Sequence, residues 1–162
     1  MPENQNVYQV CLEAVHSELV DEGFEDLASN EIQITAHPWE DDRMIMGMTI
    51  TKRTPREGQG STQRDAWFYP CVITYVVGSA RETVEGETDL TLIRKKITRR
   101  FHNKRIPMTG LTSGDLPSHC SRYTCKVTEG QITIPDEVET DNLDMTTMIV
   151  WVGVLEGREL IV

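Results

Sequence analysis

The sequence predicts one α+β domain over residues 1–162: a single mixed β-sheet of about four to five strands, with an N-terminal helix and a central helix packed on one face. The length suits one domain with a sizeable core. Two segments space their apolar residues as helices do, and the other apolar segments alternate or run on as strands do. The order helix, three strands, helix, two strands is typical of this class.

Residues 6–22 predict the N-terminal helix, with Asn6 suited to cap its start and Gly23 to end it. The helix should be amphipathic, because its apolar side chains recur at helical spacing: Tyr8, Cys11, Leu12, Val15 and Leu19. We therefore expect this row to face the core.

Two strands should follow before a long loop. Residues 31–38 alternate Ile32 and Ile34 with polar neighbours and end at a proline. After a polar turn, residues 43–53 predict a longer strand with one row of apolar side chains on a single face: Met44, Met46, Met48 and Ile50. Residues 54–65 combine glycine, proline, serine and charge without an apolar side chain, and predict a mobile loop.

The central helix is predicted within residues 89–107, a segment that holds seven of the sixteen lysines and arginines. Its core-facing stripe consists of Leu90, Ile93, Ile97 and Phe101. Acidic residues precede the helix at the positive end of its dipole, and the cations extend to the negative end. Both placements stabilise a helix.

The remaining strands surround this helix in the sequence. Residues 66–78 predict a strand with Pro70 at a bulge or an edge. The chain after the helix predicts irregular structure, a strand, an acidic loop and a last strand, over residues 107–119, 120–130, 134–144 and 145–157.

Two predicted strands are apolar on both faces, over residues 67–77 and 148–155. The helices cover one face of the sheet, so a neighbouring chain or the long loops must cover the other. We expect a homo-oligomer on this ground.

The charge of the chain is strongly polarised. The net charge is −10, although residues 89–107 carry seven positive charges and one negative charge, so the rest of the chain carries about −16. This balance argues against a surface drawn as a whole to phosphates or anionic membranes, and suits partners met in a fixed orientation. The alternative is a nucleic-acid-binding regulator that uses the basic helix, through Arg94, Lys95, Arg99, Arg100, Lys104 and Arg105.

Neither a catalytic nor a metal-binding function is predicted. The sequence lacks a glycine-rich phosphate loop, a nucleophile elbow and a His-Glu metal helix, so we expect no enzyme and no cofactor. The segment "HCSRYTC" (119–125) lacks a second ligand pair for zinc, and strand alternation should put Cys120 and Cys125 on opposite faces. The acidic loops 39–42 and 136–144 lack the ligand spacing of a calcium loop.

The start of the chain lacks the pattern of a signal peptide, and no apolar run reaches membrane-spanning length. We therefore expect synthesis in the cytosol. The four cysteines are then expected to be free thiols: Cys11, Cys71, Cys120 and Cys125.

The segments "RDAWFYPCVITYVV" (64–77) and "LIRKKITRRFHNKRI" (92–106), together with the element order, resemble the tail terminator or tail completion proteins of long-tailed bacteriophages. The resemblance covers roughly residues 6–156. Residues 107–119 and 134–144 have no counterpart that we can match, so another neck or head-closure ring protein of the virion is a second alternative.

The resemblance implies a structural virion protein, made in the host cytoplasm and located in the tail or neck. Its copies would form a ring, expected to be a hexamer, that caps the tail tube, ends its polymerisation and joins it to the head-side connector. Its partners would be the tail tube protein and the head-closure or connector protein, with DNA passing only as cargo and no membrane. The residues expected to contact neighbouring subunits or the tube are Arg53, Arg56, Arg64, Arg94, Lys95, Arg99, Arg100, Lys104, Arg105, Asp136, Glu137, Glu139 and Asp141.

Overall fold

The computed structural model describes residues 7–21, 32–58, 64–78, 89–111 and 114–157. In this part of the chain, two helices accompany a seven-stranded mixed sheet and a separate two-stranded hairpin, which confirms the predicted α+β class. The helices are α1 (Val7–Asp21) and α3 (Asp89–Phe101). Asn6 and Gly23, the predicted ends of the first helix, lie outside the described residues.

The sheet contains more strands than predicted, because several are only a few residues long. Its members are β1 (Gln33–Ile34), β4 (Gly47–Lys52), β5 (Arg56–Glu57), β6 (Arg64–Val77), β7 (Cys120–Arg122), β8 (Lys126–Glu129) and β9 (Asp144–Gly157). The spatial order is β1-β4-β6-β9-β7, with β5 also on β6 and β8 also on β9. Only the β1–β4 pair is parallel among these described strands.

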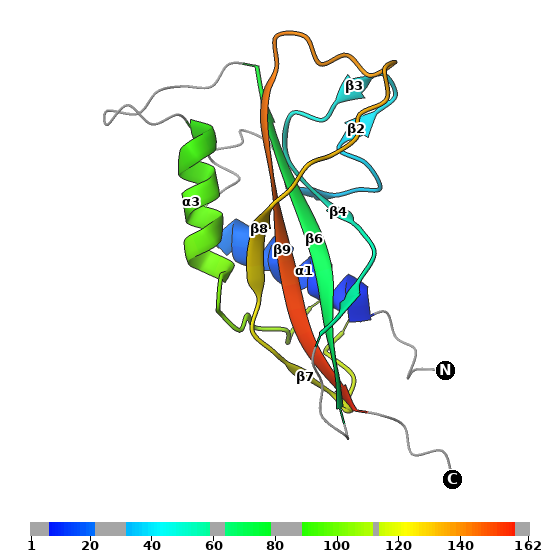
Figure 1. Cartoon of the computed structure of the whole chain (residues 1–162), viewed down its shortest axis with the longest axis vertical. Helices are drawn as coiled ribbons and strands as arrows, with labels where there is room; N and C mark the ends of the chain where they lie inside the picture. Colours follow the sequence, from blue (N-terminus) through cyan, green and yellow to red (C-terminus); the bar gives the residue numbers. More distant parts are fainter. Residues whose placement is uncertain (1–6, 22–31, 59–63, 79–88, 112–113, 158–162) are drawn as a thin grey trace.

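The antiparallel pair of β6 and β9 forms the centre of the sheet (Figure 1). Each strand has 14 residues, and they pair over their whole length. Both strands bury side chains on both faces, as predicted. Every other strand of the sheet except β1 pairs with one of these two.

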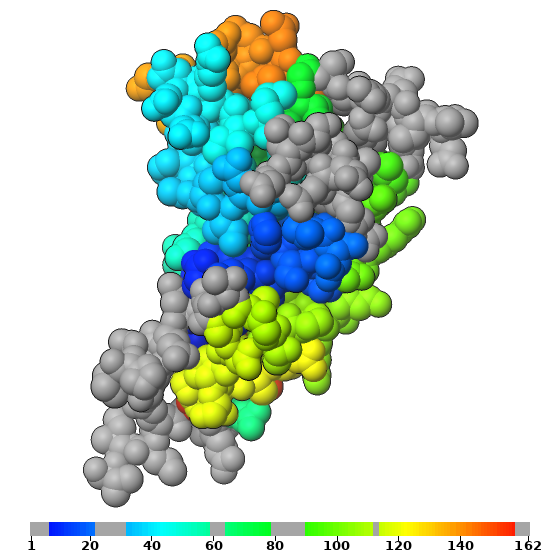
Figure 2. All heavy atoms as spheres, turned by 180° about the vertical axis from the view of Figure 1, so that it is seen from behind, coloured from blue at the N-terminus to red at the C-terminus, as the bar shows by residue number. Residues whose placement is uncertain are grey.

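The helices cover one face of the sheet. Figure 1 shows α1 crossing behind β6 and β9, with α3 alongside β8. The predicted stripe of α3 is buried through Ile93, Ile97 and Phe101, and joins the apolar row of α1 in one core. Seen from behind in Figure 2, α1 lies between the segment that contains β2 (Trp39–Glu40) and β3 (Arg43–Met44) and the segment before β7.

The other face of the sheet is covered by the chain's own loops. Val72, Ile149 and Trp151 are buried there, with Ile132 packed against them. The guanidinium of Arg56 lies 4.5 Å from the centre of the Trp151 ring. Farther along, Met44, Val76 and Val138 form another buried cluster. The sequence left open whether loops or a neighbouring chain cover this face. In the structure, segments of the same chain cover it.

Few large apolar side chains of the described residues are fully exposed. Among the described residues, the large apolar side chains classed as exposed are Val20 and Met46, at 37% and 41% of their maximum. They lie on different elements and do not form a patch with the buried clusters. We therefore expect any association of copies through the described surface to rely chiefly on polar and charged groups.

The predicted strand over residues 43–53 is interrupted. Gly47 has a φ of 93°, which glycine adopts without the steric penalty of other residues, and the hairpin strand β3 ends before it. As a result the expected row of methionines does not share one face. Met48 faces the main core, Met44 packs in the cluster with Val138, and Met46 is exposed.

The predicted loop over residues 54–65 is shorter than expected. Arg56 and Glu57 pair with β6 as β5, and β6 itself begins at Arg64. Residues 59–63 lie outside the described residues.

The polar turn predicted before residue 43 connects β2 to β3. The segment predicted as irregular, 107–119, and the predicted acidic loop, 134–144, contain no helix and no strand longer than one bridge in their described part before β9 begins at Asp144.

The predicted strand over residues 120–130 contains a bulge. Arg122 pairs with Val154 and Lys126 pairs with Trp151. The chain therefore advances four residues between these pairs, whereas β9 advances three, which leaves one extra residue in the bulge. The extra residue reverses which face the following side chains point to. Cys120 and Cys125 consequently both reach the main core, and the prediction that they lie on opposite faces is wrong.

Pro70 lies in a central strand, opposite the gap between β4 and β5. The last residues paired between β4 and β6 are Lys52 and Cys71. If the pairing continued, Arg53 would lie opposite Pro70, which has no N–H to donate. The hydroxyl of Tyr8 fills this place: it accepts from the N–H of Arg53 at 2.8 Å and donates to the carbonyl of Pro70. The proline is therefore tolerated because a side chain from α1 completes the ladder.

Candidate interaction surface

The cations of α3 lie on the side of the helix that faces away from the core. The stripe of Ile93, Ile97 and Phe101 is buried, so residues one or two positions later point outward. Lys95 and Arg99 are exposed, and Arg94 and Arg100 are half-buried. After the helix, Lys104 and Arg105 are exposed as well.

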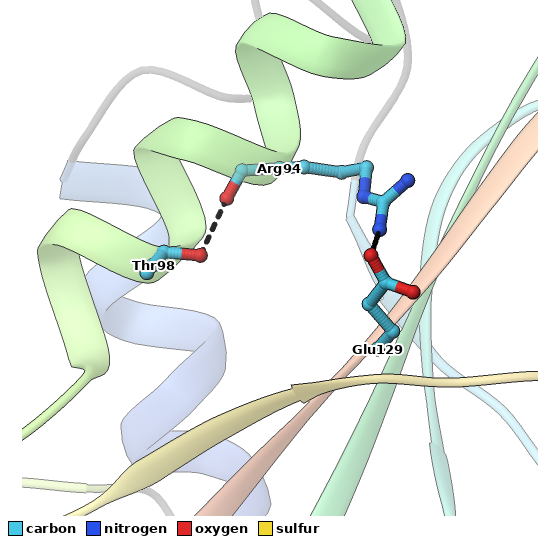
Figure 3. A network of polar contacts seen from close by, with 3 residues as sticks. All are labelled: Arg94, Thr98 and Glu129. Atoms are coloured by element: carbon cyan, nitrogen blue, oxygen red, sulfur yellow. Dashed lines mark hydrogen bonds and ion pairs between the residues drawn. The ribbon is translucent and has the colours of Figure 1, made fainter.

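Arg94 and Arg100 each form an ion pair within the described part of the chain. The guanidinium of Arg94 contacts the carboxylate of Glu129 on β8, and the hydroxyl of Thr98 donates to the Arg94 carbonyl at 2.9 Å (Figure 3). Arg100 pairs with Glu18 of α1 at 2.9 Å, and the Glu18 side chain is only 12% exposed. The first pair links α3 to the sheet, and the second links the two helices.

The segment after α3 is tied to the start of β8. Asn103 has a φ of 61°, which ends the helix, and its N–H donates to the carbonyl of Cys125 at 2.8 Å. The N–H of Cys125 donates back to Lys104 at 2.7 Å. The N–H of Val127 donates to Nδ1 of His102 at 2.9 Å. These bonds hold the basic end of α3 close to the edge of the sheet.

A groove of about 580 Å³ lies between α3 and β8. We define the groove by Arg94, Lys95, Thr98 and Arg99 on the helix and by Val127 and Glu129 on the strand. A second hollow continues beyond the Arg94–Glu129 pair, towards Ile132 and Ile134. The ion pair therefore crosses the hollowed surface between the two.

Three arginines within or next to the predicted loop are turned toward their own chain. Arg53 donates to the carbonyl of Gln131, and Arg64 donates to the hydroxyl of Ser121 at 2.9 Å. Arg56 lies over Trp151. All three hold segments across the second face of the sheet, although each residue also remains exposed. Their role in contacts with other proteins stays a prediction.

The two acidic loops meet at one end of the molecule. The N–H of Glu139 donates to the carbonyl of Asp42 at 2.8 Å, and Arg43 and Glu139 form a single bridge. We call residues 39–44 and 134–144 together the acidic tip; it is the upper end in Figure 1. Its exposed carboxylates are Glu40, Asp41, Asp42, Asp136, Glu137, Glu139, Asp141 and Asp144. Val138 is buried under the tip and anchors it.

The cysteines belong to the core rather than to a site. All four are free thiols, three of them buried. Burial raises the pKa of Cys120 and of Cys125 to about 11 each, and for Cys120 the nearby Glu156 carboxylate adds to the effect. Burial also raises the pKa of Cys11 and of Cys71 well above the ordinary range. These thiols are poor nucleophiles at neutral pH.

The described residues contain no group of three or more histidine, cysteine or acidic side chains arranged to hold a metal ion. This covers the described positions of the zinc and calcium segments considered from the sequence. In the same part of the chain, no helix combines the length and apolarity needed to cross a bilayer.

Sequence reasoning found the cations but not their partners. Glu18 could have been noticed, because it lies three and seven residues after Val15 and Cys11, on the buried stripe of α1. A carboxylate at such a position requires a buried partner. Nothing in the sequence indicated Glu129 as the partner of Arg94, since this pairing depends on how α3 crosses β8.

The structure thus separates the predicted contact residues into three places: the groove with its neighbouring cations, the second face of the sheet, and the acidic tip. Neither a protein-family model nor a curated protein matches the sequence.

Proposed function

We propose that this protein is a structural virion component that forms a ring on the end of a phage tail tube. The ring would stop polymerisation of the tube and join it to the head-side connector. The proposal combines the resemblance to tail terminator proteins with the α+β fold, in which an N-terminal and a central helix cover one face of a sheet centred on two long strands.

The observation that carries the proposal is the separation of charge on one chain. Cations gather along α3 and just after it, while eight exposed carboxylates gather on the acidic tip. Two unlike surfaces on each copy favour head-to-tail contacts, and head-to-tail contacts close into rings when the rotation permits. The acidic character of the remaining chain would also keep DNA from adhering as it passes through the ring.

A nucleic-acid-binding regulator is the second candidate, and the ion pairs of α3 weigh against it. Of the six cations that it would use, Arg94 and Arg100 already contact carboxylates of the same chain. The other described helix, α1, ends at Asp21, far before α3 begins at Asp89, so the described residues lack two helices joined by the short turn of a helix-turn-helix.

Light scattering of the purified chain, alone and with duplex DNA, distinguishes the two candidates. The ring proposal predicts a ring-sized particle that DNA does not change, whereas the regulator predicts a smaller species that binds DNA with strong salt dependence. Electron microscopy of assembled tails then tests the position: antibody or gold label on this protein should mark the head-side end of the tube. Label along the tube, or none on the virion, would contradict the proposal.

A further inference from the structure

We propose that a basic rim beside the end of α3 receives the acidic tip of a second copy of this chain. The basic rim consists of residues 103–105 together with Arg122 and Lys126. This inference deepens the proposed ring and rests on it, because it assigns the two surfaces that meet at each subunit contact.

Two segments of the chain form the rim by lying side by side. The N–H of Asn103 donates to the carbonyl of Cys125 at 2.8 Å, and the N–H of Cys125 donates to the carbonyl of Lys104 at 2.7 Å. The guanidinium of Arg122 donates to the carbonyl of Ile106 at 3.4 Å. The chain just after α3 is therefore fixed to the chain around the bulge between β7 and β8, and the cations of the two segments come together.

The cations of the rim are Lys104, Arg105, Arg122 and Lys126, and all of them are exposed. The ammonium group of Lys126 donates to the side-chain oxygen of Asn103 at 2.6 Å, and the acceptor of Arg122 is a backbone carbonyl. Both acceptors are neutral, so these hydrogen bonds position the two cations without offsetting their charge.

No carboxylate in the rim segments offsets this charge. The sequence has no aspartate or glutamate at residues 90–114 or 116–128. Arg94 and Arg100 of α3 form ion pairs, whereas no cation of the rim forms one with the described residues. The rim is therefore a positive surface independently of the contacts that the cations on α3 make.

The acidic tip has the complementary charge. Four of its exposed carboxylates belong to one loop: Asp136, Glu137, Glu139 and Asp141. Arg43 is the one lysine or arginine in the sequence of the tip. The backbone bond between Glu139 and Asp42 and the buried side chain of Val138 hold the shape of the tip before any contact forms. A pre-formed tip loses little conformational freedom on docking.

The tip does not contact the rim of its own chain. It lies at the upper end of the molecule in Figure 1, whereas the rim lies beside the lower end of α3. Among the described residues, no hydrogen bond or ion pair joins the two surfaces. A contact between them therefore joins different copies, and each copy keeps one surface of each kind for the next neighbour.

The tip suits the rim better than duplex DNA does. A duplex carries negative charge along its whole length. It would extend past the rim and meet the acidic surface of a chain whose net charge is −10. The tip is a compact end of the molecule, so its carboxylates can meet the rim alone.

Charge reversal on each surface tests the pairing. The rim variant is Lys104→Glu with Arg105→Glu, and the tip variant is Asp136→Lys with Glu137→Lys. The side chains of Lys104 and Arg105 form no hydrogen bond with the described residues, so their substitution should leave the fold intact. A swapped variant carries all four substitutions and keeps the net charge of the wild type.

The matched control for the rim variant is Lys52→Glu with Arg99→Glu. It makes the same change of net charge on exposed residues outside the rim. It therefore separates the position of the charge from its amount. Circular dichroism first confirms that each full-length variant is folded.

Sedimentation velocity at low salt then measures self-association, both alone and with purified tail tubes. We expect the rim and tip variants to associate about 100-fold more weakly than the wild type, because like charges meet at the contact, and the control to change by less than about 5-fold. The swapped variant should associate within about 10-fold of the wild type, because its two reversed surfaces are again complementary.

Three results would overturn the inference. These are a rim variant that assembles like the wild type, a control variant that loses assembly equally, and a swapped variant that stays as weak as its parents. Binding of duplex DNA that only the rim substitutions abolish would assign the rim to nucleic acid instead. If rings still form without an intact rim, the proposed function stands and only this assignment fails; a wild-type chain that assembles in neither setting removes both.

Discussion

Tyr8 shows how one side chain can make an unfavourable residue acceptable elsewhere. Pro70 removes a donor from the centre of the sheet, and the Tyr8 hydroxyl occupies the place where the β4 ladder would continue. The Tyr8 ring also packs edge-on against Tyr69, with 5.2 Å between the ring centres. Burial raises the pKa of Tyr8 above its ordinary value, so the hydroxyl keeps its proton and can donate at any physiological pH.

The substitution Tyr8→Phe should therefore lower the free energy of unfolding by about 1 to 2 kcal/mol, because it leaves the Arg53 N–H and the Pro70 carbonyl without their partner. Urea denaturation followed by tryptophan fluorescence measures the change. The control is Tyr123→Phe, whose hydroxyl has no hydrogen-bond partner among the described residues. Equal effects of the two substitutions would show that the hydroxyl of Tyr8 has no special role.

The buried thiols make stability depend on pH in the alkaline range. The pKa of Cys125 is raised from 9.0 to about 11, so the folded state holds its proton where the unfolded state has lost it. Stability from this group is complete below pH 9 and falls as the pH rises towards 11. Urea midpoints measured across this range should decline, and the decline should be smaller in Cys125→Ala. The same slope in both proteins would contradict the assignment to Cys125.

At the scale of elements, the bulge between β7 and β8 determines which side chains reach the core. Gly153 of β9 faces the bulge, and its carbonyl accepts from the N–H of Tyr123 at 2.9 Å. A Cβ at Gly153 would lie 2.6 Å from the carbonyl oxygen of Thr124 and 3.1 Å from the Tyr123 side chain. The bulge can lie this close to β9 only because residue 153 has no side chain.

The substitution Gly153→Ala should destabilise the protein by about 1 to 3 kcal/mol, because the backbone of the bulge must move to admit the methyl group. The control Gly78→Ala places a methyl group where no heavy atom lies within 4 Å, and should change stability by less than about 0.5 kcal/mol. Thermal unfolding of the two variants gives the comparison. A neutral Gly153→Ala would mean that the bulge shifts without cost.

At the scale of the whole molecule, the chain covers both faces of its own sheet. Arg56 of β5 and the segments that carry Arg53 and Ile132 lie across the face opposite the helices, and Trp151 is only 9% exposed beneath them. Both faces of the sheet thus bury side chains within one copy of the chain. Its associations are expected to be polar, unlike those of obligate oligomers, whose interfaces resemble a domain core.

If copies assemble through charge, salt should separate them into folded monomers. Raising the ionic strength to about 1 M shortens the Debye length to about 3 Å and weakens contacts between exposed charges. Sedimentation should then report monomers, while circular dichroism and the unfolding midpoint of the chain stay close to their low-salt values. Unfolding together with dissociation would show instead that an apolar interface holds the copies.

The sequence by itself determined the α+β class, the buried stripes of α1 and α3 and the two central strands, because these depend on local periodicity and on long apolar runs. It also located the basic and acidic segments that form the groove and the tip. The order of elements raised the resemblance that underlies the proposed function.

Only the tertiary structure decided how these parts meet. One extra residue between Arg122 and Lys126 reversed the faces of Cys125 and the residues after it. The pairing of Arg94 with Glu129, and the covering of the second face by the chain's own loops, join residues that are far apart in the sequence. Such contacts depend on how elements far apart in the sequence align and cross, and the local periodicity that predicts single helices and strands does not specify this.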